Sequence, residues 1–236
     1  MKTATGSPDL EALGRYALRY VKRGQVIGLG TGRAANEFIR ALAKAKLDVY
    51  GVPTSNASGE LARSLGIKLA DLGDVAKIDL DFDGADEVDP RLNLIKGWGG
   101  AMVREKIVAA ASRRRIFLVG EEKLVKRLGA RGTLPVEVVP FAVTLATREI
   151  AKLGLKPRSR SNPENAAFVT DNGNRVIDCG VKEIRNPARL ERDLRAIPGV
   201  VGTGLFLGMA DLVLVAMRDG SIKTLRRLSR PAISYR

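Results

Sequence analysis

Histidine is absent from this chain of 236 residues, and cysteine occurs only once, as Cys179. Without an imidazole, a serine or cysteine nucleophile lacks its usual base, and zinc or iron lacks its commonest ligand. We therefore expect no metal site and no cofactor, and any acid-base chemistry must use Asp, Glu or Lys side chains. A single cysteine cannot form an intrachain disulfide, and the apolar run around Cys179 predicts a small buried strand residue.

Long apolar runs are missing as well. No stretch of the sequence approaches the roughly 20 apolar residues that a membrane-spanning helix needs. Residues 1–9 also lack the apolar segment of a signal peptide. We therefore expect a cytoplasmic protein that has no membrane partner.

Aromatic residues are scarce, at 5% of the chain, whereas the formal net charge is +14. Such a charge suits an anionic partner, either a phosphorylated metabolite or a nucleic acid. The basic residues are dispersed, which is typical of a solvated surface, so we expect a small-molecule partner and no nucleic acid. A solvated role is also expected for the basic residues after Asp219, which are Lys223, Arg226, Arg227, Arg230 and Arg236.

The first half of the chain alternates short apolar runs with helical patterns. The runs Val26–Leu29, Ile78–Phe82 and Arg115–Val119 predict buried strands. Apolar residues at helical spacing predict helices over residues 10–21, 35–42, 59–65 and 101–111. This alternation predicts a mostly parallel sheet, which the apolar run Asp211–Ala216 is expected to rejoin.

The pattern changes near Gly132. Strands are predicted at residues 135–139, 167–170, 175–178 and 200–205, and helices at 141–153 and 187–196. The second and third strands are expected to form a hairpin around residues 171–174, and the order β-α-β-β-α-β is ferredoxin-like. We therefore expect an α/β protein, with a Rossmann-like mostly parallel sheet domain (residues 1–131 and 206–236) and an inserted ferredoxin-like α+β domain (residues 132–205).

A glycine turn follows the first predicted strand. Gly30-Thr31-Gly32 lies between that strand and a helix, so free backbone N–H groups and the positive end of the helix dipole favour an anion there. The turn resembles a dinucleotide fingerprint, but Asp48 precedes the second apolar run, where a ribose-binding acid would follow it. We expect a phosphate monoester, with donors from Thr31 and Arg33; a tight turn without a ligand is the alternative.

Carboxylates gather where the strand Ile78–Phe82 ends. The segment Asp83-Gly84-Ala85-Asp86-Glu87 is followed by Lys96 in a glycine cluster and by Glu105 near the start of a helix. Ligands bind at the carboxyl edge of such sheets, and a base, a cation and hydroxyl acceptors are what proton transfer requires. Residues 83–86 alone would fit a turn with capping carboxylates. With Lys96 and Glu105 added, the cluster predicts proton transfer on a polar substrate.

Seven motifs resemble the ribose-5-phosphate isomerases of type A, in order and at similar spacings over nearly the whole chain. They are Gly28–Gly32, Asp83–Asp86, Lys96–Gly97, Arg104–Lys106, Leu134–Val138, Val169–Gly173 and Ile197–Val200. The resemblance implies an aldose-ketose isomerase that interconverts D-ribose 5-phosphate and D-ribulose 5-phosphate through an enediolate, in the non-oxidative branch of the pentose phosphate pathway. It also implies a homodimer or homotetramer.

The resemblance assigns roles to particular residues. Glu105 is implied as the base that moves a proton between C1 and C2, while Lys96, Asp83 and Asp86 line the sugar. The implied substrate contacts, chiefly on the phosphate side, are Thr31, Gly32, Arg33, Ala34, Gly84, Ala85, Gly97, Trp98, Gly99 and Lys123.

Two positions depart from the pattern of that family. Arg33 and Ala34 stand where hydroxyl residues are common, and we predict that the Arg33 guanidinium grips the phosphate. Trp98 replaces a glycine, so its ring either narrows the pocket or packs outward. Both departures bear on substrate preference, because the spacing between Lys96 and Glu105 is retained.

Other functions compete with this interpretation. A non-catalytic sugar-phosphate sensor would need the glycine turn but not the full set of proton-transfer groups. A coenzyme A transferase is another alternative, because the predicted fold would also suit that class of enzyme. Binding of nucleic acid would rest on net charge alone.

Overall fold

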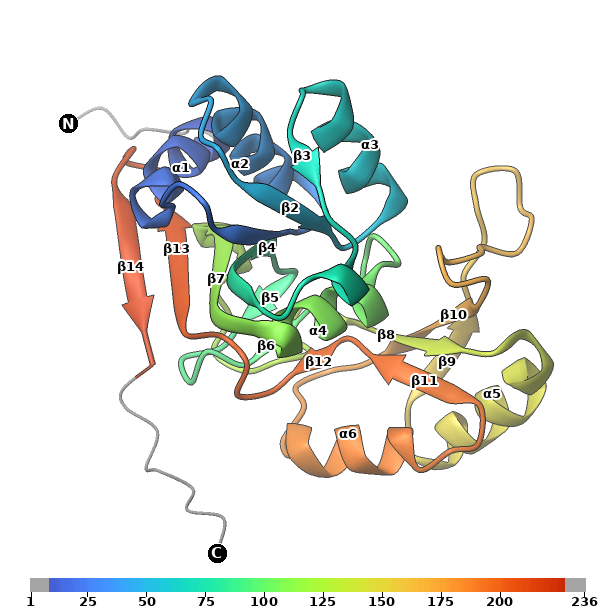
Figure 1. Ribbon diagram of the computed structural model, residues 1–236. Helices are drawn as coiled ribbons and strands as arrows, with labels where there is room; N and C mark the ends of the chain where they lie inside the picture. Colours follow the sequence, from blue (N-terminus) through green and yellow to red (C-terminus); the bar gives the residue numbers. More distant parts are fainter. Residues whose placement is uncertain (1–8, 228–236) are drawn as a thin grey trace, which may run out of the picture.

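The computed structural model describes residues 9–227, whose strands form one large sheet and two smaller ones (Figure 1). The large sheet has seven strands in the order β14-β13-β7-β4-β1-β2-β3, and every neighbouring pair except β13 and β14 is parallel. This confirms the expected mostly parallel sheet, with Leu212–Ala216 rejoining it. Its strands are β1 (Val26–Leu29), β2 (Tyr50–Pro53), β3 (Lys68–Leu69), β4 (Ile78–Gly84), β7 (Ser112–Gly120), β13 (Leu212–Ala216) and β14 (Ile222–Arg226).

Helices cover both faces of the large sheet (Figure 1). On one face α1 (Leu10–Ala17) and α2 (Arg33–Lys44) bury a core with β4, in which the rings of Phe38 and Phe82 stack 4.0 Å apart. Beside α2 lies α3 (Asn56–Ser64), and α4 (Met102–Ala111) packs on the opposite face. The side chains of β4 therefore alternate, with Leu80 and Phe82 in the first core.

The second sheet is antiparallel and has the strand order β11-β8-β10-β9. With α5 (Val143–Lys152) and α6 (Pro187–Arg195) it makes the expected ferredoxin-like order β-α-β-β-α-β. The strands are β8 (Thr133–Val138), β9 (Lys156–Ser159), β10 (Arg175–Gly180) and β11 (Val200–Thr203). Cys179 is fully buried in β10, as expected, and burial raises the pKa of its thiol to about 12. The domain limits near residues 132 and 205 stay a prediction.

One predicted strand is wrong. Residues 167–170 form a loop, and the hairpin partner of β10 is β9, which contains Pro157. A proline inside a run argues against a strand, but at the edge of a sheet its missing N–H costs no ladder bond. Because β9 is an edge strand, the sheet tolerates Pro157 there.

A third, three-stranded sheet pairs two strands that precede α4 with one strand that follows β11. Its strands are β5 (Glu87–Val88), β6 (Leu94–Ile95) and β12 (Leu205–Phe206), with β6 in the middle. The connections also contain four short 3-10 turns, at Leu18–Tyr20, Leu72–Asp74, Glu121–Lys123 and Pro140–Ala142. Within residues 9–227, no helix has the length and hydropathy to cross a membrane. Arg230 and Arg236 of the basic C-terminal segment lie outside the described residues.

Candidate active site

The site begins at the carboxyl end of β4, where the carboxylate of Asp83 turns back against β1. Asp83 Oδ1 accepts hydrogen bonds from the backbone N–H of Thr31 at 3.0 Å and of Gly84 at 2.7 Å. A Cβ atom at Gly30 would overlap the Asp83 carboxyl group, so a glycine is required at this point of closest approach. The glycine turn after β1 and the end of β4 are thus held together by the Thr31–Asp83 hydrogen bond and by close packing at Gly30.

A buried lysine links two carboxylates. Lys96, just after β6, places its Nζ 2.9 Å from Asp83 Oδ2 and 3.2 Å from Glu105 Oε2, and donates to the Gly84 carbonyl oxygen at 2.6 Å. The three side chains are each at most 5% exposed. An ammonium group has three N–H donors, and three protein oxygens lie within 3.2 Å of Lys96 Nζ.

Burial shapes the acidity of this cluster. Removal from water, and then the charge of Asp83, raise the pKa of Glu105 to about 8. Burial also raises the pKa of Asp83, although Lys96 and the two backbone N–H groups oppose that effect. Burial alone would lower the pKa of Lys96, but the neighbouring carboxylates outweigh it and raise the pKa above its ordinary value. Glu105 is therefore a carboxyl group that exchanges its proton near neutral pH.

A cavity of about 140 Å³ opens beside this cluster. Glu105 and Lys96 lie in its wall, and so does Asp86, which also accepts the backbone N–H of Trp98 at 3.0 Å. Asp83 lies behind Lys96 and does not line the cavity. The other predicted residues that line it are Thr31, Gly32, Arg33, Ala34, Gly84, Ala85, Gly97, Gly99 and Lys123.

One end of the cavity is suited to an anion. The cavity reaches the N-terminus of α2, where Gly32 has φ +107° and no side chain caps the first turn, so the backbone N–H groups stay available. The exposed Arg33 and the half-buried Lys123 add positive charge. Burial, followed by repulsion from Arg131, lowers the pKa of Lys123. An anion bound here would relieve that repulsion.

Trp98 packs outward, which was one of its two expected orientations. Its indole N–H donates to the Thr133 carbonyl oxygen at 3.3 Å, and its ring does not line the cavity. The ring lies 5.5 Å from Lys123 Nζ and 5.2 Å from the guanidinium carbon of Arg131. Trp98 thus contacts cations at the rim of the site.

Sequence reasoning assigned no role to two acidic residues near the site. Glu122 lines the cavity. Glu87 is fully buried and accepts the backbone N–H groups of Gly129 and Arg131, each at 2.6 Å, so it holds the segment that carries Arg131. The position of Glu87 after Asp86 was visible in the sequence, but partners so far along the chain were not. Among residues 9–227, no three carboxylate or cysteine groups are arranged to hold a metal ion.

Asp81 is a third buried carboxyl group on β4. It is fully buried next to Gly28 and Val108, and neither carboxyl oxygen has a hydrogen-bond partner among the described residues. Burial, and then the charge of Asp83, raise its pKa well above the ordinary value. Asp81 therefore keeps its proton to a higher pH in the folded protein than in the unfolded chain.

The raised pKa of Asp81 predicts a pH-dependent effect of Asp81→Asn. An acid whose pKa is raised by folding destabilises the folded state increasingly as the pH rises above its unfolded value, and asparagine cannot titrate. Between pH 4 and pH 8, the free energy of unfolding should therefore shift in favour of the variant, as measured by urea denaturation. A difference that did not change with pH would mean that folding does not raise the pKa of Asp81.

The fold and the site together define a class of protein. A buried carboxyl group with a pKa near 8 beside a buried lysine, at the carboxyl edge of a parallel sheet and next to an anion-accepting helix start, is typical of enzymes that move a proton on a small anionic molecule.

Comparisons with known proteins agree with this class. Residues 50–220 match the family model described as ribose 5-phosphate isomerase A (phosphoriboisomerase A). The chain is similar to ribose-5-phosphate isomerase A of Roseiflexus castenholzii, with 50% identity over 88% of this chain and 91% of the relative. It is also similar to the Thermomicrobium roseum protein of the same name, with 45% identity over 92% and 93% of the two chains. The chain belongs to the ribose 5-phosphate isomerase A family.

Solved structures support the same assignment. Ribose 5-phosphate isomerase A of Methanocaldococcus jannaschii superposes with a TM-score of 0.87 at 40% identity, over 92% of this chain and 98% of that one. A D-ribose-5-phosphate isomerase in complex with phospho-erythronic acid gives a TM-score of 0.90 at 38% identity, over 94% and 100% of the two chains. The expected Rossmann-like fold and the resemblance to this family are confirmed, and the alternative of a sensor is not favoured.

Proposed function

We propose that this chain interconverts D-ribose 5-phosphate and D-ribulose 5-phosphate through an enediolate, as a step of the non-oxidative pentose phosphate pathway. The observation that carries the proposal is the placement of Lys96 between Asp83 and Glu105 in the wall of a cavity that reaches the start of α2. A relative binds phospho-erythronic acid, whose planar carboxylate has the shape and charge of an enediolate.

Glu105 is the proposed base. In the open-chain aldose it removes the proton from C2, so that a C1–C2 double bond forms and negative charge moves to O1. Asp86 lines the cavity, and its Oδ1 is not used by the Trp98 N–H, which supports a role in passing a proton from O2 to O1. Glu105 then returns its proton to C1, and the product is the ketose.

Lys96 is the proposed cation for the enediolate oxygen. Three protein oxygens surround its Nζ, and the contact with Glu105 is the longest of the three at 3.2 Å. When Glu105 takes a proton it becomes neutral, and its attraction for the ammonium group weakens. One donor of Lys96 is thereby released at the moment when negative charge develops on the substrate.

The phosphate is proposed to bind at the start of α2, with Arg33 as one of its contacts. Arg33→Ala should raise the KM for ribose 5-phosphate by about tenfold, because a charge-assisted hydrogen bond contributes about 1.5–3 kcal/mol, and should change kcat less. Steady-state kinetics would measure both constants. Arg113→Ala, which removes an exposed arginine at the start of β7, is the matched control. An unchanged KM in Arg33→Ala would rule out the phosphate contact.

The direct test of the function is an assay of the purified protein with ribose 5-phosphate in excess chelator. Formation of ribulose 5-phosphate, with solvent deuterium appearing at C2 of the recovered aldose, is the expected result for an enediolate. Binding of ribose 5-phosphate without turnover would favour a sensor instead, and a hexose phosphate assayed in parallel would measure how strictly the cavity selects pentoses.

We also propose that the protein is cytoplasmic and is a homodimer or homotetramer. Phe141 is fully exposed after β8, and Leu145 on the next helical turn is 36% exposed, which is typical of an interface residue pair. Phe141→Asp should give a smaller species in sedimentation velocity than the wild type does. Leu65→Asp, at an exposed apolar residue after α3, should leave the size unchanged. Equal sizes for all three proteins would place the interface elsewhere.

A further inference from the structure

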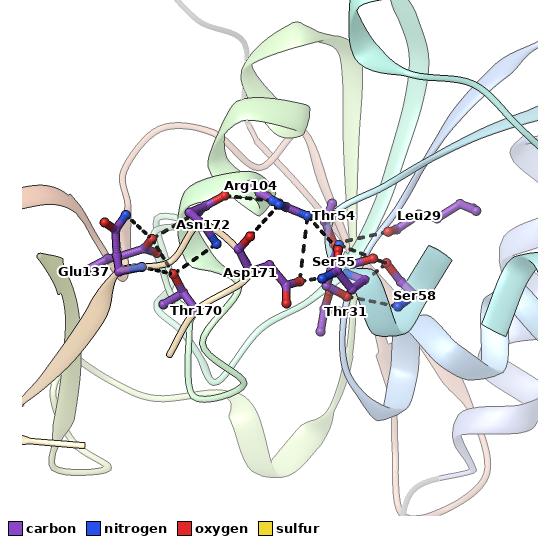
Figure 2. A network of polar contacts seen from close by, with 12 residues as sticks. Leu29, Thr31, Thr54, Ser55, Ser58, Arg104, Glu137, Thr170, Asp171 and Asn172 are labelled. Carbon is purple, nitrogen blue, oxygen red and sulfur yellow. Dashed lines mark hydrogen bonds and ion pairs between the residues drawn. The ribbon is translucent and has the colours of Figure 1, made fainter. Parts of the chain in front are cut away.

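A loop of the small sheet reaches across to the large one. Residues 170–174, here called the 170–174 loop, precede β10 and are fastened by Glu137 of β8, which is fully buried (Figure 2). Glu137 Oε1 accepts hydrogen bonds from Thr170 Oγ1 at 3.0 Å, Asn172 Nδ2 at 3.1 Å and Asn174 Nδ2 at 2.9 Å. The base of the loop is therefore held by the small sheet.

The tip of the same loop is bound to two helices of the large sheet (Figure 2). Asp171 Oδ2 accepts the backbone N–H of Asn56, the first residue of α3, at 2.7 Å. Arg104 in the first turn of α4 donates from Nε to Asn172 Oδ1 at 2.8 Å and from a terminal nitrogen to the Asp171 carbonyl oxygen at 2.7 Å. Its other terminal nitrogen donates to Asn56 Oδ1 at 3.0 Å, so one guanidinium joins the loop to both helix starts.

The contacts continue into the cavity. Ser55, directly before Asn56, caps α3, and its hydroxyl group lies 2.8 Å from the hydroxyl group of Thr31. Thr31 lies 2.8 Å from Thr54 as well, and it lines the cavity. On the other branch, Arg104 directly precedes Glu105. Figure 2 shows this continuous path from Glu137 to Thr31.

We infer that the 170–174 loop and Arg104 are positioning residues for the substrate cavity, which set the hydroxyl group of Thr31 and the start of α4. The inference deepens the proposed function and rests on it. Partial exposure supports a positioning role over a purely structural one: the side chains of Arg104 and Asp171 are 36% and 30% exposed, and such contacts contribute little to stability. Catalysis, by contrast, is sensitive to displacements of about 1 Å.

The experiment compares Asp171→Ala, Asp171→Asn and Arg104→Ala with the wild type. Asp171→Ala should raise the KM for ribose 5-phosphate, and the Kd for phospho-erythronic acid by calorimetry, by about fivefold, which is within the range for the loss of one ordinary hydrogen bond. Asp171→Asn keeps an acceptor oxygen for the Asn56 N–H and should stay within about twofold of the wild type, since its main contact is preserved. Arg104→Ala should raise KM and also lower kcat, because it releases both helix starts. Arg63→Ala is the matched control, since Arg63 of α3 is exposed and has no side-chain hydrogen bond or ion pair within residues 9–227.

The double variant Arg104→Ala/Asp171→Ala provides a test of coupling. Because both residues act through Asn56, the combined effect on kcat/KM should be smaller than the product of the two single effects.

Wild-type KM, kcat and Kd in both alanine variants would overturn the inference, and so would an Asp171→Asn variant as impaired as Asp171→Ala. If Asp171→Ala does not fold, Asn172→Ala removes the neighbouring contact and should raise KM and Kd in the same way. A wild type that binds phospho-erythronic acid without isomerase activity would contradict the proposed function, while the Kd values would still decide the positioning role.

Discussion

Glu105→Gln should lower kcat by about a thousandfold, within the range that general-base catalysis contributes, while the protein folds normally. Glutamine has nearly the shape of glutamate but cannot accept the proton from C2. Because the pKa of Glu105 is raised to about 8, its side chain is mostly uncharged at neutral pH, and Lys96 keeps Asp83 as its ion-pair partner in the variant. No large loss of stability is therefore expected at neutral pH. Stopped assays with high enzyme concentration would measure the residual rate, and thermal unfolding would check the fold. More than a tenth of the wild-type rate would assign the base to another residue.

The pH dependence of the wild type should carry the signature of the same residue. A base must be ionised, and the pKa of Glu105 is raised to about 8, so kcat/KM should rise with pH and level off above about 8. Below that value, each pH unit should lower kcat/KM by about tenfold, because the ionised fraction falls in that proportion. The low residual activity of Glu105→Gln should not show this rise with pH. A wild-type profile that is flat between pH 6 and pH 8 would contradict the assigned pKa.

Lys96→Met should affect both activity and stability. The positive charge of the Lys96 ammonium group lies beside the buried carboxyl groups of Asp83 and Glu105. Removing one partner of a buried ion pair lowers the free energy of unfolding by about 3–5 kcal/mol. The enediolate would also lose its cation, so kcat should fall by at least about a hundredfold, as for the loss of an oxyanion donor. Urea denaturation and the isomerase assay would measure the two effects.

The stability loss of Lys96→Met should depend on pH in a defined direction. Without the lysine, the pKa values of Asp83 and Glu105 rise further, so both groups are protonated in the folded variant over a wider pH range. A group whose pKa is raised by folding destabilises the protein as the pH rises, so the deficit should be larger at pH 8 than at pH 5. Lys68→Met, which removes a cation from the exposed pair with Asp48, should show no such loss. An equal deficit at both pH values would mean that the lysine acts through packing alone.

The sequence predicted those parts of the fold that local patterns determine. The apolar run Val26–Leu29 ends at a glycine, and β1 has these same limits. β9 was missed because Pro157 and its charged neighbours lack a strand pattern, and the edge of the sheet tolerates them. The two-residue strands β5, β6 and β12 carry no periodicity at all, since they exist only through pairing between distant segments.

In the candidate site, as in the fold, the features that local sequence patterns determine were predictable and the long-range contacts were not. The alternating pattern placed Asp83 at the carboxyl edge of the parallel sheet. Lys96 and Glu105 follow it within one connection and the helix start after it, so their proximity to Asp83 was predictable from the sequence. Their burial does not follow from it, and neither does the three-way contact of Lys96, because both depend on how α4 packs. The partners of Arg104 lie in a loop of the other sheet, and no spacing within one sequence indicates such contacts.

The pairing of β6 with β12 constrains the order in which the chain can assemble. The backbone N–H of Lys96 donates to the carbonyl oxygen of Gly204 at 2.9 Å, and Ile95 pairs with Leu205, so the lysine is fixed by residues that follow β11 in the chain. Closing so long a loop is slow compared with local helix formation. During synthesis, the chain as far as β12 must therefore leave the ribosome before the backbone of Lys96 can make this hydrogen bond, and catalytic competence should be among the last properties that the nascent chain acquires.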